Sequence, residues 1–349
     1  MRLTDLSTKT SRWFDPDSPL SDIVISSRIR LARNLANRKF ITKCTSNEKN
    51  QILQTLKEVI LSLNSLGDIF FIDIEHGSTI ERDLLIERQL ISRNLAAGSG
   101  PRGAVIAQNE LFAAQINEED HLRLSVLAPG LNIEKCWQRI NEIDDSIGEK
   151  IEYAFSPKYG FLTACPTNLG TGIRVSVMMH LPALKMTDQL KKLFDSARDM
   201  NLTIRGLFGE GTEAIGDFFQ ISNQVTLGIS EKKIVNDFQT VIIPKIVEYE
   251  RIARDKLLIQ EVNILDDKIA RALALLKSAK LISSHEAMFL LSNLRMGINM
   301  GRVKEISIQT INELFLLTQP AHLQINKGKS LNPQQRDILR AETLRAKLN

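Results

Sequence analysis

The spacing of apolar residues changes once along this sequence, near residue 230, and this change constrains the fold more than any other feature. Before it, apolar runs of strand length occur at residues 69–74, 104–108, 111–115, 121–127, 160–164, 173–180, 203–208 and 220–228. Amphipathic helices, with apolar residues at steps of three and four, are predicted there for residues 50–66, 133–147 and 188–200. After residue 230 the pattern is almost wholly helical, which predicts a second domain built from helices.

Short connections between the strand-like runs favour an antiparallel sheet. Residues 104–108 and 111–115 flank Asn109 and Glu110 as the two strands of a hairpin would. We therefore expect an α+β fold, with an antiparallel sheet carrying helices on one face in residues 1–245 and an all-helical domain in residues 246–349. Pro244 should kink or end a helix near Ile243.

Composition excludes several classes of protein. With 349 residues, 43% of them hydrophobic and 25% charged, the chain has the length and apolar content of about two folded domains. No apolar run approaches the roughly 18 residues of a membrane span, so we expect a cytoplasmic protein that does not enter a membrane. The net charge of +4 is mild and aromatic residues make up only 5%, which argues against nucleic-acid binding. Cys44, Cys136 and Cys165 are far apart, so neither a disulfide framework nor a structural zinc site is expected.

Two arginines share one side of a predicted extended segment. In S-S-R-I-R-L-A-R, residues 26–33, the alternation of a strand places Arg28 and Arg30 on the same face. Two forked guanidinium groups on one face can bind phosphate oxygens bidentately. From this motif alone, a solvated strand face is the alternative.

A second motif, N-E-E-D-H-L-R at residues 117–123, sets three carboxylates beside a histidine and an arginine at the start of a predicted strand. Adjacent acids in a turn are often simply solvated. Here they border apolar strands, where burying a carboxylate destabilises the fold unless it has an ion-pair partner or a functional role.

Two further loops carry an arginine beside small residues. C-P-T-N-L-G-T-G-I-R, residues 165–174, offers backbone N–H groups to an anion, and its cysteine accompanies an arginine that favours the thiolate. R-G-L-F-G-E, residues 205–210, ends in a carboxylate. Together the motifs supply several carboxylates, one thiol and five candidate arginines at strand ends of one sheet, and these arginines are Arg28, Arg30, Arg123, Arg174 and Arg205. That combination suits transfer of a phosphoryl group to a positively charged acceptor.

These four ordered motifs resemble those of the ATP:guanido phosphotransferase (phosphagen kinase) family, and most closely its bacterial protein arginine kinase branch. The resemblance implies a glutamine-synthetase-like catalytic domain, with an antiparallel sheet flanked by helices, and ATP and Mg²⁺ as cofactors. It implies that Glu119, Glu210 and Cys165 are catalytic, and that Glu118 contacts Mg²⁺ through water, without a direct protein-only metal site. The ATP-binding residues that it implies are Ser26, Ser27, Arg28, Ile29, Arg30, Gln89, Arg123, Arg174, Val175, Ser176, Val177, Met178, Arg205, Gly206, Leu207, Phe208, Gly209 and Glu210.

The chemistry agrees with these roles. A guanidinium is a poor nucleophile because its pKa is about 13, so it must lose a proton as it attacks the γ-phosphorus. Glu119 is the candidate proton acceptor. The arginines and Mg²⁺ would neutralise the phosphates without a P-loop.

The resemblance favours a protein as the phosphoryl acceptor. Small-molecule kinases of the family carry a helical domain before the S-x-R-x-R motif, with a loop that closes over the substrate, whereas 25 residues precede Ser26 here. Met178 and Gly211, where those kinases tend to have histidine, also fit the protein-kinase branch, while Gln89 replaces an adenine-side histidine of that branch. A kinase of free arginine or another small guanidino compound is one alternative. A non-catalytic phosphoarginine-binding regulatory protein is another.

The sequence R-D-I-L-R-A, residues 336–341, resembles an allosteric phosphoarginine-binding motif of the branch. Arg336 and Arg340 are four residues apart and would share a helix face, and the resemblance adds Asp337 and Ala341 to this site. It further implies protein substrates with exposed arginines, a zinc-containing activator protein, an AAA+ protease that degrades the marked proteins, and a homodimer.

Overall fold

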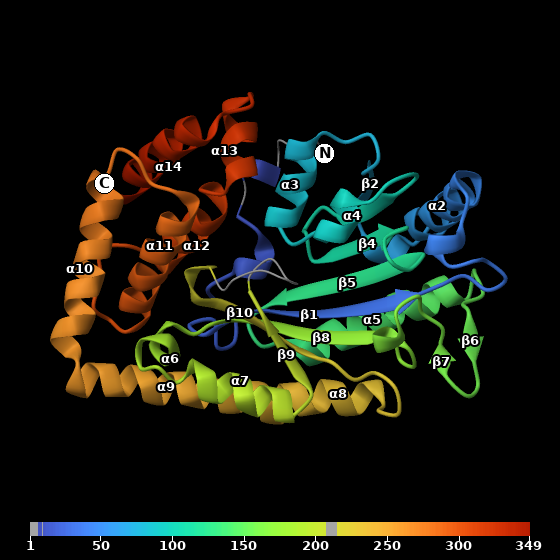
Figure 1. Cartoon of the computed structure of the whole chain (residues 1–349), viewed down its shortest axis with the longest axis horizontal. Helices are drawn as coiled ribbons and strands as arrows, with labels where there is room; N and C mark the ends of the chain where they lie inside the picture. Colours follow the sequence, from blue (N-terminus) through green and yellow to red (C-terminus); the bar gives the residue numbers. More distant parts are fainter. Residues whose placement is uncertain (1–5, 9, 207–214) are drawn as a thin grey trace.

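A computed structural model of the protein describes residues 6–8, 10–206 and 215–349. Its centre is an antiparallel sheet of eight strands in the order β2-β3-β4-β5-β1-β8-β10-β9, which confirms the expected sheet (Figure 1). The strands are β1 (Val24–Arg33), β2 (Ile69–Asp73), β3 (Gly103–Ala107), β4 (Phe112–Ile116), β5 (Leu122–Pro129), β8 (Ile173–His180), β9 (Leu202–Arg205) and β10 (Phe218–Asn223).

The two faces of the sheet differ in polarity because alternate strand residues point to opposite sides. In β1, Ile29 and Leu31 are buried on one face, and Arg28 and Arg30 point to the other. Helices α2 (Ser46–Leu61), α5 (Ile133–Gly148) and α8 (Glu231–Asp237) pack on the apolar face. The polar face remains open over its central strands.

At the β2–β4 end, helices cover the polar side of the sheet as well. Helices α3 (Thr79–Glu87) and α4 (Arg93–Ala97) pack there against Ala104, Ile106 and Ala113. Helices therefore lie on both faces, and the expectation of helices on one face alone is wrong at this end. The second layer matters because it forms a wall beside the open central strands.

Most predicted elements lie within about five residues of those in the structure, and two differ. Residues 207 and 208 of the strand predicted at 203–208 lie outside the described residues. Of residues 160–164, predicted as a strand, only β7 (Gly160–Phe161) pairs, with β6 (Phe155–Ser156), and the remainder is loop. The helix also does not end before Pro244, because α8 continues through a π-helical turn, Phe238–Ile242, into α9 (Ile243–Gln260). Proline is tolerated there because it occupies the first turn of α9, where its missing N–H costs little.

The C-terminal part is helical, as predicted. After α9 it consists of α10 (Val262–Ser278), α11 (Ser284–Asn299), α12 (Ile308–Leu317), α13 (Pro320–Lys327) and α14 (Pro333–Leu348). Its apolar residues join those of the sheet in one hydrophobic core. The proposed domain boundary between residues 245 and 246 falls inside α9 and stays a prediction. Within the described residues, no helix has the length and apolar character that crossing a bilayer requires.

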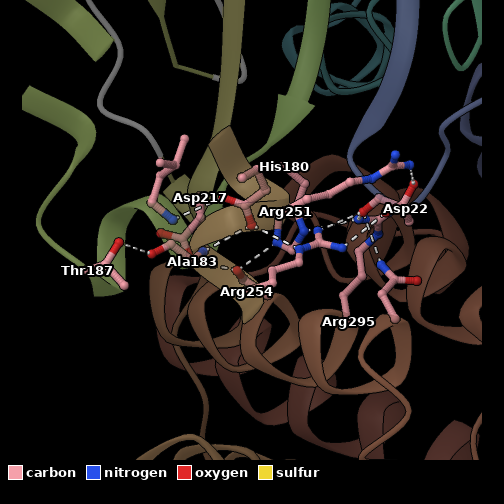
Figure 2. Close-up of polar contacts among 12 residues, drawn as sticks. Asp22, His180, Ala183, Thr187, Asp217, Arg251, Arg254 and Arg295 are labelled. Carbon is pink, nitrogen blue, oxygen red and sulfur yellow. Dashed lines mark hydrogen bonds and ion pairs between the residues drawn. The ribbon is translucent and has the colours of Figure 1, made fainter. Parts of the chain in front are cut away.

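Buried polar contacts join the C-terminal helices to the sheet (Figure 2). Arg295 on α11 donates a hydrogen bond to the backbone oxygen of Asp22 at 3.1 Å, just before β1, and its Nη1 lies 3.0 Å from Nδ1 of His180 at the end of β8. His180 Nε2 donates to Ser292 Oγ at 2.8 Å, and Ser292 Oγ donates to Asp217 Oδ2 at 2.6 Å. Helix α11 is thereby fixed to the ends of β1, β8 and β10.

Candidate functional site

A cavity of about 490 Å³ opens on the polar face of the sheet. Strands β1, β5 and β8 contribute to its floor, and residues in and beside α3 and α4 form one wall. The predicted site residues that line it are Arg28, Arg30, Gln89, Glu118, Glu119, Arg123, Cys165, Arg174 and Arg205. The fold thus brings together the five predicted arginines, two of the predicted acids and the predicted cysteine.

The register of the sheet explains why the arginines converge. Arg30 lies opposite Arg174 in the pairing of β1 with β8, and opposite Ser125 in the pairing of β1 with β5. Arg28 lies opposite Ser176. Because directly opposed residues share a face, both arginines of β1 point to the same side as Arg174.

Burial and mutual repulsion perturb these arginines. The pKa of Arg28 is lowered to about 10, first by burial and then by the positive charges of Arg174 and Arg123. The pKa of Arg30 is lowered well below its usual value, again chiefly by burial and then by its arginine neighbours. Among the described residues, none accepts a hydrogen bond from the buried Nε of Arg30. Such a cluster of crowded cations favours a polyanionic ligand.

Uncharged side chains orient two of the arginines. Arg28 donates from Nη1 to Gln89 Oε1 at 3.3 Å and from Nε to Ser176 Oγ at 3.5 Å. Arg174 donates from Nη2 and Nε to Ser222 Oγ at 3.0 and 3.3 Å. These hydrogen bonds orient the two guanidinium groups on the cavity face of the sheet.

Two acids occupy one end of the cavity, joined by Arg123. Arg123 forms an ion pair with Glu118 and a second one, at 3.2 Å, with Glu119. Ser92 Oγ donates to Glu118 at 2.7 Å, and the Glu118 side chain is only 1% exposed, against 38% for Glu119. The pKa of Glu119 is raised above its usual value, chiefly by burial and against the effect of Arg123. Glu119 therefore combines solvent access with increased proton affinity, which suits a proton acceptor.

The third acid, Asp120, has a structural role. Its side chain is buried, and Oδ1 accepts hydrogen bonds from Asn34 Nδ2 at 2.6 Å and from the Ala164 N–H at 2.7 Å. Ala164 directly precedes Cys165. Asp120 thus attaches the cysteine loop to the acidic turn, and the three neighbouring acids perform different tasks.

The described residues include no group of three or more His, Cys, Asp or Glu side chains able to hold a metal ion. Glu118 and Glu119 are nevertheless carboxylates in the cavity lining. This donor set fits a magnesium ion bound mainly by phosphate oxygens, with a carboxylate that reaches it through water.

Several predicted ATP-site residues lie beside the cavity and do not line it. Ile29, Val175 and Val177 are fully buried on the apolar face, because they alternate with the residues that face the cavity. The predicted residues that are buried and outside the lining are Ser26, Ser27, Ser176, Met178 and Gly206. The predicted residues Leu207, Phe208, Gly209 and Glu210 lie outside the described residues. The ATP-binding role of these motifs stays a prediction.

The cavity also contains polar residues that the sequence analysis missed. They are Ser92, Arg93, Asn94, Gln115, Ser125, Thr167, Asn168, Thr203, Gln220 and Gln224. Ser125 follows Arg123 by two residues, so strand alternation alone would have placed it in the site. Ser92 and Arg93 carry no such signal, since they reach the cavity only because α3 and α4 cover the sheet there.

The R-D-I-L-R-A motif lies on α14, away from the cavity lining. Arg340 is buried and donates hydrogen bonds at 2.8 Å to the backbone oxygens of Thr318 and Ile282. Arg336 is partly exposed and donates from Nη1 to the backbone oxygen of Leu331 at 2.7 Å. Arg340 therefore holds helices together in this structure. Phosphoarginine binding by Arg336, Asp337, Arg340 and Ala341 stays a prediction.

Comparison with solved structures gives the same fold. A lombricine kinase is 26% identical, with a TM-score of 0.58 over 71% of this chain and 70% of that one. The duplicated taurocyamine kinase of Schistosoma mansoni is 25% identical, with a TM-score of 0.62 over 70% of this chain and 37% of that longer one.

Comparison of sequences identifies the family. Residues 51–253 match the C-terminal catalytic domain of ATP:guanido phosphotransferases, and residues 262–349 match the C-terminal domain of the protein-arginine kinase McsB. A protein-arginine kinase of Halothermothrix orenii is 43% identical over 352 residues, covering 100% of both chains. Another, of Bacillus pumilus, is 44% identical over 97% of this chain and 93% of its own. The chain belongs to the ATP:guanido phosphotransferase family, in which it groups with the protein-arginine kinases.

Proposed function

We propose that the protein transfers the γ-phosphoryl group of ATP to the guanidinium of arginine side chains in proteins. The observation that carries this proposal is the cavity, in which arginines that suit a polyphosphate lie beside carboxylates and a thiol that suit a guanidinium. Similarity to proteins named protein-arginine kinase over the whole chain supports the same activity.

In this proposal the five arginines bind the phosphates of ATP. The residues are Arg28, Arg30, Arg123, Arg174 and Arg205. Their charges would stabilise the negative charge on the transferred group and on the departing ADP, so catalysis comes from positioning and charge neutralisation. When bound together with ATP, Mg²⁺ would neutralise phosphate charge, and Glu118 is suited to hold it through a water molecule.

The acceptor guanidinium would lie at the acidic end of the cavity. Glu119 orients it and takes its proton, the guanidinium nitrogen forms a bond to the γ-phosphorus, and the bond from that phosphorus to the β–γ bridging oxygen breaks to release ADP. Cys165 lines the same cavity and contacts the guanidinium in this proposal, together with Glu210, which lies outside the described residues. The exposure of Glu119 supports an acceptor that projects from a larger body, such as an arginine on a protein.

Mass spectrometry tests this proposal. The full chain is incubated with Mg-ATP and either an arginine-rich unfolded protein or free arginine, and acid-labile phosphoarginine is counted on each. We expect label on the protein, and at least a hundredfold less with Glu119→Gln. The matched control is Glu142→Gln, an exposed acid on α5 whose side chain is 67% exposed.

The two alternatives give different results in this experiment. Label on free arginine alone would identify a small-guanidine kinase. ATP binding without label on either acceptor, under conditions where the fold is intact, would contradict the proposal and favour a regulatory binding protein.

We further propose a cytoplasmic homodimer that works with a zinc-containing activator and an AAA+ protease, as in the family. Exposed apolar side chains on the C-terminal helices support self-association: Ile252, Ile259 and Ile264 are 53%, 81% and 55% exposed. Light scattering of the purified chain would measure its mass. A monomer at micromolar concentration would contradict the dimer.

A further inference from the structure

A buried polar cluster connects helix α13 of the C-terminal part to helix α3 of the cavity wall, two helices that lie side by side in Figure 1. Its members are Glu87 and Arg88 at the end of α3, Glu110 between β3 and β4, and His322 on α13. All four are buried, and Arg88 and His322 are 0% exposed. Ionisable groups are rarely removed from water so completely unless they hold a specific arrangement.

Glu87 attaches the start of α13. Its carboxylate accepts hydrogen bonds from the N–H groups of Ala321 at 2.8 Å and His322 at 3.2 Å, and lies 2.8 Å from His322 Nδ1. A carboxylate at a helix N-terminus satisfies otherwise unpaired N–H groups and complements the helix dipole. The end of α3 and the first turn of α13 therefore form one unit.

Arg88 completes the cluster from the other side. It binds Glu110 through Nε at 2.6 Å and Nη2 at 2.8 Å, and its Nη1 lies 3.2 Å from His322 Nε2. Because an arginine can only donate, Nε2 of His322 must accept, so its Nδ1 carries the proton and donates to Glu87. Each polar group of His322 thus has one defined partner.

The next residue, Gln89, reaches the cavity. Its backbone has φ +63°, a left-handed conformation that residues other than glycine adopt only when their surroundings hold them. Its Oε1 accepts the hydrogen bond from Arg28 at 3.3 Å, and both side chains line the cavity. The backbone of Gln89 is fixed by the C-terminal turn of α3, in which the N–H of Gln89 donates to the oxygen of Ile86 at 2.9 Å and the N–H of Leu90 donates to the oxygen of Leu85 at 2.9 Å. The side chain of Arg88, the residue before Gln89, holds this end of α3 against α13.

The same chain of contacts extends to α14. Arg340 donates from Nε to the backbone oxygen of Thr318 at 2.8 Å, and Thr318 lies two residues before Pro320, the first residue of α13. A continuous set of bonded groups therefore runs from α14 through α13 and the end of α3 to Arg28.

We propose that Glu87 and His322 are positioning residues through which the C-terminal helices set the affinity of the cavity for ATP. They hold Arg88, and with it Gln89 and Arg28, in the arrangement that receives the nucleotide. The identity of the nucleotide rests on the proposed function, but the link between the helices and the cavity does not.

Direct binding of a fluorescent ATP analogue to the full chain tests this role without requiring phosphoryl transfer. We expect His322→Leu to weaken binding about tenfold, and to raise the KM for ATP with kcat at saturating ATP changed less than about twofold. His322→Gln keeps a donor and an acceptor and should restore most of the affinity. His285→Leu, an exposed histidine on α11, is the matched control. Glu87→Gln provides a second measurement should His322→Leu not fold.

A double-mutant cycle with Gln89→Ala separates coupling from general destabilisation. If the link runs through Gln89, His322→Leu should change ATP affinity less than twofold once Gln89 is alanine. Equal effects of His322→Leu in both backgrounds, or unchanged affinity in a folded His322→Leu protein, would overturn the proposal. A wild-type protein that binds ATP and phosphorylates nothing would count against the proposed function alone.

Discussion

Arg30 and Arg174 lie directly opposite each other in the ladder between β1 and β8, with both guanidinium groups on the face that carries the cavity. Like charges at opposed positions of a sheet destabilise the pairing. The pKa of Arg30 is lowered chiefly by burial, and the positive charges of Arg28, Arg123 and Arg174 lower it further. The sheet therefore holds several positive charges close together. Their repulsion destabilises the unliganded protein, and a bound anion would relieve it.

We predict that Arg30→Gln stabilises the unliganded protein while it lowers activity. Removing one of the crowded charges should raise the free energy of unfolding by about 1 kcal/mol. Phosphoryl transfer should fall at least a hundredfold. Urea unfolding and the mass-spectrometric assay measure the two effects, with Arg198→Gln, an exposed arginine on helix α7 (Leu190–Asp199), as control. A clear loss of stability in Arg30→Gln would show that this arginine is structural.

A second prediction concerns the pH dependence of catalysis. Glu119 must be ionised to accept a proton from the substrate. Because its pKa is raised, it ionises at a higher pH than an ordinary glutamate does. The acid limb of kcat/KM should accordingly lie above pH 4.5, the usual pKa of the group, and activity should rise with pH through it. Glu119→Gln should abolish this limb along with most of the activity. An unchanged limb in the residual activity of the variant would assign it to another group.

Asp120 allows a third prediction, which separates structure from catalysis within one motif. Asp120→Ala leaves the Ala164 N–H and the Asn34 amide without their acceptor in a buried place, and should cost about 2–3 kcal/mol of stability. Asp120→Asn keeps an acceptor oxygen at the same position and should recover most of the stability and activity. Denaturant unfolding of both variants measures this. Full stability but no activity in Asp120→Ala would instead make Asp120 a catalytic residue.

The sequence predicted the sheet and its arginines because both depend on short-range patterns. A strand alternates with a period of two, so Arg28 and Arg30 share a face in any register. Motif order along the chain then suggested that Arg123, Arg174 and Arg205 belong to the same site. Their actual convergence depends on the strand order, which places β5, β1 and β8 side by side, and that order is set by packing across the whole sheet.

The parts of the site that escaped prediction depend on long-range contacts. Gln89 was named, but its place in the site depends on the end of α3, where Arg88 contacts His322, a residue far along the sequence. No sequence motif includes His322, because its partners, Glu87 and Arg88, come from another element. The π-helical turn before Pro244 was missed for a similar reason, since local propensity alone predicted a kink or a helix end near Ile243.

A fourth prediction concerns the motif on α14. Arg340→Ala removes the donor from two buried backbone oxygens, those of Thr318 and Ile282. It should lower the free energy of unfolding by about 2–3 kcal/mol, with or without phosphoarginine. Arg336→Ala removes one bond at a partly exposed site and should cost less than 1 kcal/mol. Arg336 is therefore the better test of phosphoarginine binding, measured by calorimetry. Unchanged binding in Arg336→Ala would argue against a site at this motif.

The network in Figure 2 leads to a prediction about stability and pH. His180 is fully buried, and burial followed by the charges of Arg295 and Arg254 lowers its pKa well below 6.5. The folded protein therefore keeps this imidazole neutral at a pH where the unfolded chain takes up a proton. Stability is fully present above about pH 6.5, the unfolded value, and is lost as the pH falls towards the folded pKa, by about 1.4 kcal/mol per pH unit.

The titration of His180 is isolated by comparing the wild type with His180→Gln, because other buried histidines, such as His322, contribute to the same slope. Glutamine can still donate to Ser292 and accept from Arg295, so the variant should fold, but it binds no proton when it unfolds. In urea unfolding between pH 5 and pH 7.5, the free energy of unfolding should change with pH less steeply in the variant, and the difference should approach about one proton below pH 6.5. His285→Gln, at an exposed position on α11, should keep the wild-type slope. Equal slopes in His180→Gln and the wild type would mean that the folded protein protonates His180 as readily as the unfolded chain does. His180 would then not be a neutral imidazole that bridges Arg295 and Ser292.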